Sequence, residues 1–147
     1  MFFKEEKGKP YVLLLPSHGR LKIPGGMQEE EDATPEEAML RESEEELNVR
    51  PTNAEPQGDY PDPNNPLNLR AFWNACEWDG EIRTEPKDIE GEWIEAPIWV
   101  ELTPELISDV RPKVVYSHLI PLKKGIMWAT TKFPSFYYFV RDNRVAA

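Results

Sequence analysis

Cysteine is nearly absent from this sequence: Cys76 is the only one among 147 residues. One thiol cannot form an internal disulfide, and it excludes a metal site built from several cysteines. A chain that does not rely on disulfides suits a reducing compartment, so we expect the protein in the cytoplasm.

Long apolar runs are missing as well. The longest one near the start of the chain is Tyr11–Leu15, whereas a membrane span needs roughly 18–20 apolar residues. Met1–Pro10 is rich in charge and does not resemble a secretory signal. We therefore expect no membrane partner.

Positive charge is scarce: 17 Lys and Arg stand against 27 Asp and Glu, a net charge of −10. Ten of the acids and one base, Arg41, lie between Glu29 and Glu46, so this segment carries −9 and the rest of the chain −1. Such a segment repels nucleic-acid backbones, and we do not expect nucleic acid as a partner. It is either a solvated helix surface or a divalent-cation site, because Mg²⁺ and Ca²⁺ prefer carboxylate oxygens.

The length and the apolar pattern indicate one α/β domain over residues 1–147. Domains cluster at roughly 100–150 residues, and 39% hydrophobic residues suffice for one core. Apolar runs and turn residues predict strands at Tyr11–Pro16, Leu21–Ile23, Leu67–Trp78, Gly91–Ile98 and Phe133–Val140. They predict helices at Pro35–Leu47 and Pro104–Leu119, the second kinked at Pro112 or divided there into two pieces, and a loop at Thr52–Pro66. We expect the helices to cover a sheet.

The helix predicted at Pro35–Leu47 has signals at both ends. Thr34 can serve as its N-cap, Pro35 suits the first helical position, and Glu37 completes a Thr-x-x-Glu capping box. Asn48 tolerates the left-handed conformation, so we expect it to stop the helix.

One face of this helix gathers carboxylates. At about 100° per residue, Arg41, Glu42, Glu45 and Glu46 fall within an arc of roughly 140°. The three carboxylates stand at i, i+3 and i+4, where like charges repel unless a cation neutralises them. Arg41 lies four residues before Glu45 and can orient it as an ion pair. A bound Mg²⁺, or Mn²⁺ in its place, would neutralise these carboxylates, so Glu42, Glu45 and Glu46 are candidate ligands.

A family motif accounts for the same residues. A strand, a turn and the lead-in Leu-Lys-Ile-Pro-Gly-Gly precede the Arg-Glu-x-x-Glu-Glu core at Arg41–Glu46. This stretch resembles the Nudix box of the Nudix (MutT-like) hydrolases, G-x5-E-x7-R-E-U-x-E-E-x-G-U, where U is aliphatic. The resemblance implies an α/β/α sandwich with a mixed β-sheet. It also implies Mg²⁺-dependent hydrolysis of a diphosphate that joins a nucleoside to another moiety, hence a nucleotide-type small-molecule substrate.

The spacing departs from the box at its first acid. Counting back from Arg41, that acid falls on Ala33, because one residue is inserted between Gly26 and Thr34. Ala33 cannot bind a cation or hold a water molecule. We therefore expect the loop to bulge and to bring Asp32 toward the metal face, with Glu31 as the fallback.

The resemblance implies roles for further residues. Asp32, Arg41 and Glu45 are expected at the catalytic centre, and Gly26 permits close backbone approach to the metal. The family often adds a carboxylate from a distant loop; Glu85 and Glu90 are the candidates here, against the alternative of an ordinary acidic loop. Arg20 and Tyr60 are candidate substrate contacts, through a phosphate and a stacked base, against surface exposure and core packing.

Two other functions stay open at this point. The first is a catalytically weak or inactive Nudix-like domain that binds a nucleotide as a sensor; the displaced first acid favours it, and the intact core argues against it. The second is an acidic cation-binding or protein-interaction domain, against which the Pro-Gly-Gly lead-in counts. The sequence does not identify the diphosphate substrate, and a homodimer is compatible with it.

Overall fold

The longest strand of the protein, β2 (Lys9–Ser17), runs through the middle of the fold in the computed structural model, which describes residues 1–25, 31–65 and 67–146. β2 pairs antiparallel with β1 (Phe3–Glu6), with β10 (Ile98–Glu101) and, beyond a turn, with β3 (Arg20–Lys22). Its residues 12–15 are fully buried. A strand buried on both faces explains the uninterrupted apolar run in the sequence.

The remaining strands form three antiparallel pairs. These are β4 (Arg50–Thr52) with β7 (Glu77–Asp79), β5 (Glu55–Pro61) with β6 (Leu69–Asn74), and β8 (Lys87–Ile89) with β9 (Glu92–Ile94). Parallel bridges join Phe2 to Ala75 and Leu21 to Val114. The paired strands are thus all antiparallel, and in the described residues the parallel part of the expected mixed sheet is limited to these two bridges.

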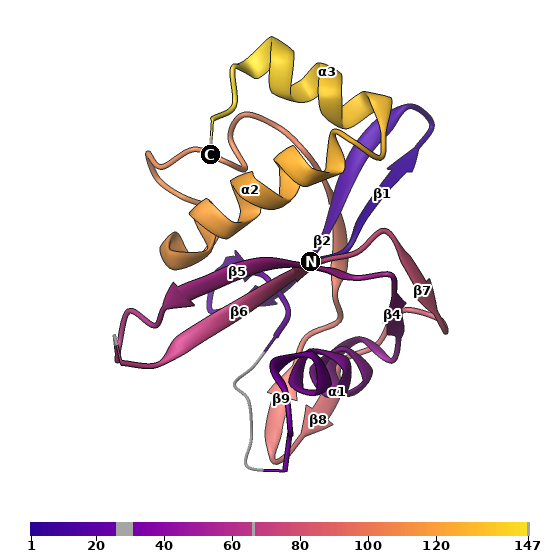
Figure 1. Cartoon of the computed structure of the whole chain (residues 1–147), viewed down its shortest axis with the longest axis vertical. Coiled ribbons are helices and arrows are strands. Elements are labelled where there is room, and N and C mark those ends of the chain that lie inside the picture. Colours follow the sequence, from indigo (N-terminus) through magenta and orange to yellow (C-terminus); the bar gives the residue numbers. More distant parts are fainter. Residues whose placement is uncertain (26–30, 66, 147) are drawn as a thin grey trace.

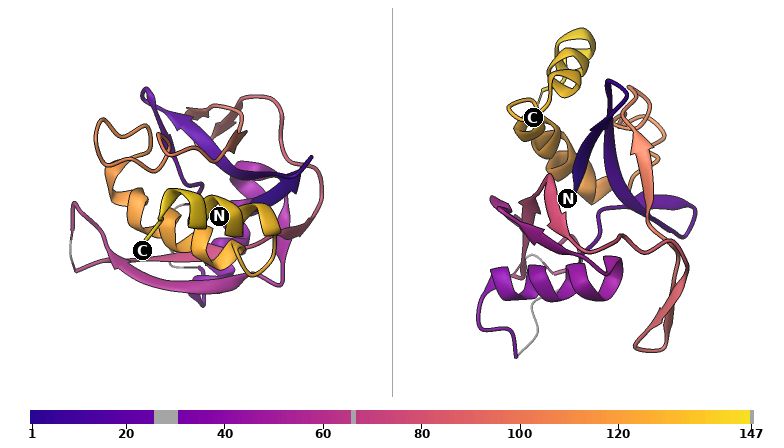
Figure 2. Two further views of the ribbon diagram at one scale, coloured as in Figure 1. Left: turned by 90° about the horizontal axis from the view of Figure 1, so that it is seen from above. Right: turned by 90° about the vertical axis from the view of Figure 1, so that its right-hand side faces the viewer.

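The helices cover the strands from two sides, and the α/β/α sandwich is confirmed. α1 (Pro35–Leu47) lies on one side, and α2 (Leu119–Ala129) and α3 (Pro134–Asn143) lie on the other (Figures 1 and 2). Leu13 belongs to the smaller core with Leu47 of α1, whereas Val12 and Leu14 belong to the larger core with α2 and α3. In the described ranges, no helix is long and apolar enough to cross a membrane.

Gly125 fixes how closely α2 approaches the first strand. A Cβ at this position would lie 2.7 Å from Cζ of Phe3 and 2.9 Å from Cε of Met1. Only a residue without a side chain permits this contact.

The predicted loop at Thr52–Pro66 is wrong, because residues 55–61 form β5. Pro56 and Pro61 lack N–H groups, but β6 is the only partner of β5 in the described residues, so one edge needs no donors. A bulge between Pro56 and Gly58 absorbs the local irregularity.

Two strand predictions are right in type and wrong in length. The segment Leu67–Trp78 divides into β6 and β7, because Ala75 between them bonds to the first residues of the chain instead. The segment Gly91–Ile98 divides into β9 and β10 around Pro97. The predicted strands at Tyr11–Pro16 and Leu21–Ile23 are confirmed as β2 and β3, within a residue or two at their ends.

The C-terminal third was predicted wrongly. Residues 104–115 form turns rather than a helix; Arg111 has φ 54° and Pro112 follows. The spaced apolar residues there, such as Leu106 and Val114, still fill the core. A short 3₁₀ turn, η1 (Tyr116–His118), leads into α2.

The aromatic segment Phe133–Val140, predicted as a strand, lies in α3. Pro134 opens that helix, and Phe136, four residues before Val140, is buried in the larger core. The i, i+4 spacing, rather than aromatic content, decided the structure here.

Candidate active site

The N-terminal end of α1 forms as its sequence predicts. The hydroxyl of Thr34 accepts a hydrogen bond from the Glu37 N–H at 3.1 Å. Glu37 reaches back to the N–H of Ala33 at 2.7 Å, one residue before the N-cap, so the capping box is shifted. Asn48 ends the helix in the left-handed conformation at φ 64°. These contacts fix the start, the end and hence the rotation of the helix.

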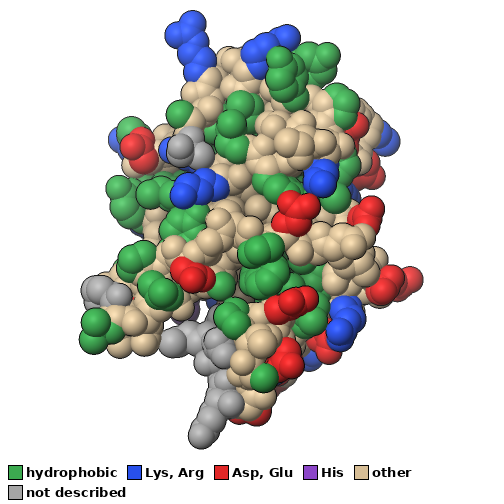
Figure 3. Space-filling model, in the orientation of Figure 1, with side chains coloured by type: hydrophobic (Ala, Val, Ile, Leu, Met, Phe, Trp, Pro, Cys, Tyr) green, Lys and Arg blue, Asp and Glu red, His purple; other side chains and the backbone are tan. Residues whose placement is uncertain are grey.

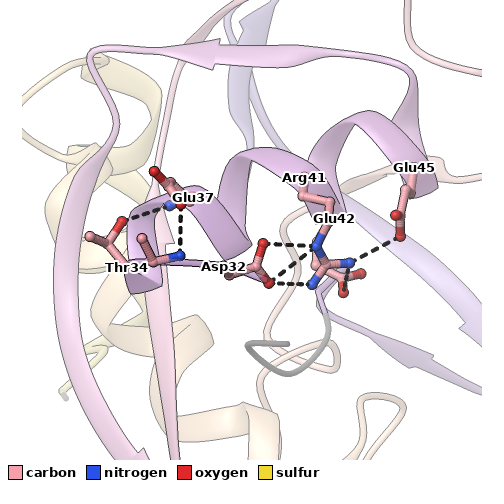
Figure 4. Close-up of polar contacts among 7 residues, drawn as sticks. Asp32, Thr34, Glu37, Arg41, Glu42 and Glu45 are labelled. Carbon is pink, nitrogen blue, oxygen red and sulfur yellow. Dashed lines mark hydrogen bonds and ion pairs between the residues drawn. The ribbon is translucent and has the colours of Figure 1, made fainter. Parts of the chain in front are cut away.

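Arg41 gathers three carboxylates on one face of α1 (Figure 4). Its guanidinium binds Asp32 through two nitrogens, the shortest contact being 2.8 Å from Nη2 to Oδ2. Nη1 donates to Glu42 at 3.0 Å and to Glu45 at 3.2 Å. The expected ion pair between Arg41 and Glu45 is confirmed. Asp32 is buried, with only 6% of its side chain exposed.

With one residue inserted before Thr34, Asp32 therefore contacts Arg41, the arginine of the motif. Asp32 rather than Ala33 contacts this face, through Arg41. Part of the expected bulge, including Gly26, lies outside the described residues. Glu31 is described and is exposed.

Glu46 is the most buried carboxylate of the helix, at 8% exposure. Burial raises the pKa of the Glu46 carboxyl to about 8, and a hydrogen bond with Glu42 adds to this rise. Lys22 and the Gly25 N–H act in the opposite direction. Without a cation, the Glu46 carboxyl therefore keeps its proton at neutral pH.

This carboxylate pair fits a hard divalent cation. Its donors are oxygens, and the buried Oε2 of Glu46 has no hydrogen-bond partner in the part of the chain that is described. A cation would satisfy that atom and displace the proton of Glu46. No three acidic, histidine or cysteine side chains among the described residues converge as a preformed metal site. The third carboxylate, Glu45, instead turns toward Arg41.

The C-terminal end of α1 is held by two cations that sequence reasoning missed. Lys87 donates to the Glu45 carbonyl at 3.0 Å, and Arg83 Nε donates to the Glu46 carbonyl at 2.8 Å. One sequence feature could have predicted such contacts: the last turn of the helix contains no basic residue. Its carbonyls must therefore accept hydrogen bonds from another segment.

The two distal candidates, Glu85 and Glu90, are exposed on the segment that carries these cations. Glu90 stands at the tip of the β8–β9 hairpin with φ 53°. Among the described residues, no hydrogen bond or ion pair joins either carboxylate to α1. The backbone carbonyl of Glu85 accepts from Arg83 Nη1 at 2.6 Å.

A cavity of about 720 Å³ opens between α1 and the β5–β6 hairpin. Glu42 and Ser43 line it on the helix side, and Phe72, Trp73 and His118 line it on the other. This volume is in the range of small-molecule sites.

His118, which sequence reasoning set aside as structural, is buried in the wall of this cavity. Its Nδ1 accepts the Ile23 N–H at 3.0 Å. The pKa of His118 is lowered to about 4, mainly by burial and in addition by the charges of Arg70 and Lys22. The imidazole is therefore neutral and carries its proton on Nε2.

The two expected substrate contacts lie outside the cavity wall. Arg20 is exposed on β3, and Lys22 from the same strand lines the cavity instead. Tyr60, expected on a loop, lies in β5. Its hydroxyl donates to Gln57 at 2.7 Å, and its ring packs edge-on against Phe72 at 5.4 Å.

Charge is unevenly distributed over the face that Figure 3 shows. Asp and Glu side chains occur in both halves of this face, including the lower part where α1 lies in Figure 1, whereas most Lys and Arg side chains stand over the upper half.

Comparison with known proteins agrees with this geometry. The sequence matches the family model described as NUDIX domain over residues 1–113. The fold is similar to that in the solution structure of the E. coli ORF135 protein, with a TM-score of 0.55, 20% identity, and coverage of 91% of this chain and 90% of that chain. At this identity the likeness concerns the fold alone. No curated protein matches the sequence significantly.

Proposed function

This chain belongs to the Nudix family, and on that premise we propose that it is a Mg²⁺-dependent pyrophosphohydrolase of nucleoside diphosphates linked to another moiety. Membership supports pyrophosphohydrolase-type activity in general, divalent metals in general, and small-molecule nucleotide-linked substrates. The proposal adds Mg²⁺, the residue roles, and residues 1–147 acting as one domain in the cytoplasm.

One observation carries the proposal: Arg41 joins Asp32, Glu42 and Glu45 on the helix face where a buried oxygen of Glu46 has no hydrogen-bond partner among the described residues. In an ordinary solvated helix, carboxylates point into water and need no such arrangement. Glu42 also lines the cavity, so a diphosphate bound at this face has room for its nucleoside there.

Glu42 and Glu46 would hold the cation, with Glu45 beside them. When bound, the cation neutralises charge on the diphosphate and lowers the pKa of water. In the reaction, a water oxygen attacks one phosphorus, the bridging P–O bond breaks, and the bridging oxygen leaves with the other phosphate.

We assign the water's proton to Glu45, because its carboxylate is the most exposed of the three, at 37% against 15% for Glu42. Arg41 holds Glu45 in place, and Asp32 holds Arg41, which gives the displaced acid a positioning role. Glu85 and Glu90 are the alternative bases.

The cavity wall supports a nucleoside as the bound moiety. Phe72 and Trp73 offer aromatic surface, Lys22 and Arg70 offer positive charge for an anion, and His118 offers an N–H donor. Arg20 and Tyr60 would contact the substrate only from outside this wall.

A screen for hydrolysis tests the proposal. The full chain is incubated with Mg²⁺ or Mn²⁺ and a panel of nucleoside diphosphate derivatives, and the products are separated by chromatography. Glu46→Gln should abolish turnover while keeping the fold, because glutamine resembles the protonated carboxyl in shape. The control is Glu36→Gln on the exposed first turn of α1, which should behave like wild type.

Equal losses in the two variants would mean that α1 is only structural. If nucleotides bind and none is cleaved, the sensor function replaces this proposal. The displaced first acid is the observation that favours that second candidate.

A further inference from the structure

The last three carbonyls of α1 are capped by residues that lie far from the helix in the sequence. The carbonyls of Glu45, Glu46 and Leu47 accept hydrogen bonds from Lys87 Nζ (3.0 Å), Arg83 Nε (2.8 Å) and the Arg83 N–H (3.0 Å). Two of these carbonyls belong to glutamates of the proposed metal site.

Arg83 is unusual among the cations of the protein because only 6% of it is exposed. Besides the Glu46 carbonyl, its guanidinium donates to the carbonyls of Glu85 (2.6 Å), Ile94 (3.4 Å) and Glu95 (3.0 Å). No carboxylate in the described residues pairs with it. A buried charge is tolerated only where its donors are satisfied, and here backbone dipoles satisfy them.

These contacts tie two segments together that are far apart in the sequence. The carbonyl end of α1 is joined to residues 83–95, which carry β8, β9 and the exposed Glu85. Figure 1 shows the β8–β9 hairpin beside α1. A positive charge at this end also complements the helix dipole.

We propose that Arg83 and Lys87 form a carbonyl clamp whose function is to position Glu45 and Glu46 for the cation. The clamp touches neither substrate nor metal, so both are positioning residues, and the inference rests on the proposed function. A displacement of about 1 Å in a reacting group can cost about 100-fold in rate. Fraying of the last helical turn would move both carboxylates by at least that much.

The test compares Lys87→Met and Lys87→Arg with Arg83→Lys in the full chain. Lys87→Met removes one donor from a half-buried site, so the variant should still fold. Lys87→Arg keeps a cationic donor and serves as the conservative rescue. Arg83→Lys keeps the positive charge and removes the planar guanidinium, whose N–H groups reach several carbonyls.

Arg50→Met is the matched control. Arg50 is also a cation near this end of α1, but it pairs with the exposed Glu44 side chain at 3.2 Å rather than with a carbonyl. The readouts are Mn²⁺ affinity by electron paramagnetic resonance, the melting temperature, and hydrogen exchange of the Asn48 and Val49 amides, which bond within the last turn.

We expect Lys87→Met to weaken Mn²⁺ binding by about fivefold and Arg83→Lys by about tenfold, with faster exchange in the last turn. At fivefold, the loss corresponds to about 1 kcal/mol. Lys87→Arg should restore binding, and Arg50→Met should change nothing. The melting temperature of Lys87→Met should stay close to that of wild type. If Lys87 had only a structural role, weaker Mn²⁺ binding would be accompanied by a lower melting temperature.

Unchanged Mn²⁺ affinity in both Lys87→Met and Arg83→Lys would overturn the clamp while leaving the proposed function intact. If wild-type protein binds no Mn²⁺, the proposed function fails and positioning of a metal site fails with it. Hydrogen exchange then tests the clamp separately from the metal site. Faster exchange in the variants would show that the clamp still stabilises the end of α1, and unchanged exchange would exclude this structural role as well.

Discussion

The contact between Asp32 and Arg41 yields the sharpest prediction, because it is buried and uses two guanidinium nitrogens. With 6% of Asp32 and 19% of the Arg41 side chain exposed, solvent screens the pair little. At about 4 Å between charge centres and an effective dielectric constant of about 20, the attraction is roughly 4 kcal/mol.

Asp32→Asn keeps the shape and one acceptor oxygen and removes the charge. We expect about 3 kcal/mol of lost stability, since removal of one partner from a buried pair typically costs 3–5 kcal/mol. For a chain of this size that is roughly 6–12 °C in melting temperature. Turnover should fall at least about tenfold, or about 1.4 kcal/mol of barrier, because Arg41 loses its anchor and no longer holds Glu45.

Urea unfolding of wild type, Asp32→Asn, Arg41→Gln and the double variant measures the coupling directly. A coupling energy of about 2 kcal/mol is expected, at the upper part of the range for contacting residues. Glu36→Gln is the control for loss of an exposed acid from the same helix. A coupling below about 0.5 kcal/mol would refute this account of the pair, and full turnover in Asp32→Asn would remove its catalytic role.

Three further outcomes follow from features described above. Millimolar Mg²⁺ should raise the melting temperature of wild type but not of Glu46→Gln, because a ligand that binds only the folded state stabilises it; an identical response in both would exclude Glu46 as a ligand. The pKa of His118 is about 4 in the folded protein and near 6.5 in the unfolded chain. Its contribution to stability is therefore full above pH 6.5 and decreases as the pH falls toward 4, by on the order of 3 kcal/mol. Denaturant titrations at pH 7 and pH 5 should therefore show a smaller pH effect in His118→Gln than in wild type, and equal effects would contradict a buried neutral ring. Gly125→Ala should destabilise the fold by about 1–3 kcal/mol through overpacking against Phe3, and a melting temperature equal to that of wild type would show that α2 can shift.

The sequence predicted α1 almost to the residue because its signals are local. Thr34, Pro35 and Asn48 act through contacts within a few positions, and the structure confirms the predicted cap and stop. The Arg41–Glu45 contact was also predictable, since it depends only on the spacing along one helix.

The predictions that were wrong or missing concern features that depend on contacts between residues far apart in the sequence. α3 is a helix because Phe136 enters the larger core at helical spacing, and aromatic content alone favoured a strand. The role of Arg83 arises from its contact with Glu46, 37 positions away, which no local pattern reveals. His118 likewise faces a cavity whose other wall belongs to α1.

The alternation of side chains along β2 has a consequence for how the molecule opens. Leu13 packs toward α1, and Val12 and Leu14 pack toward α2 and α3. Neither side can detach without exposing one face of the same strand to water. Proteolysis and hydrogen exchange should therefore find no separate half of this protein: the β2 amides should exchange only through global unfolding, at the slowest rate in the chain.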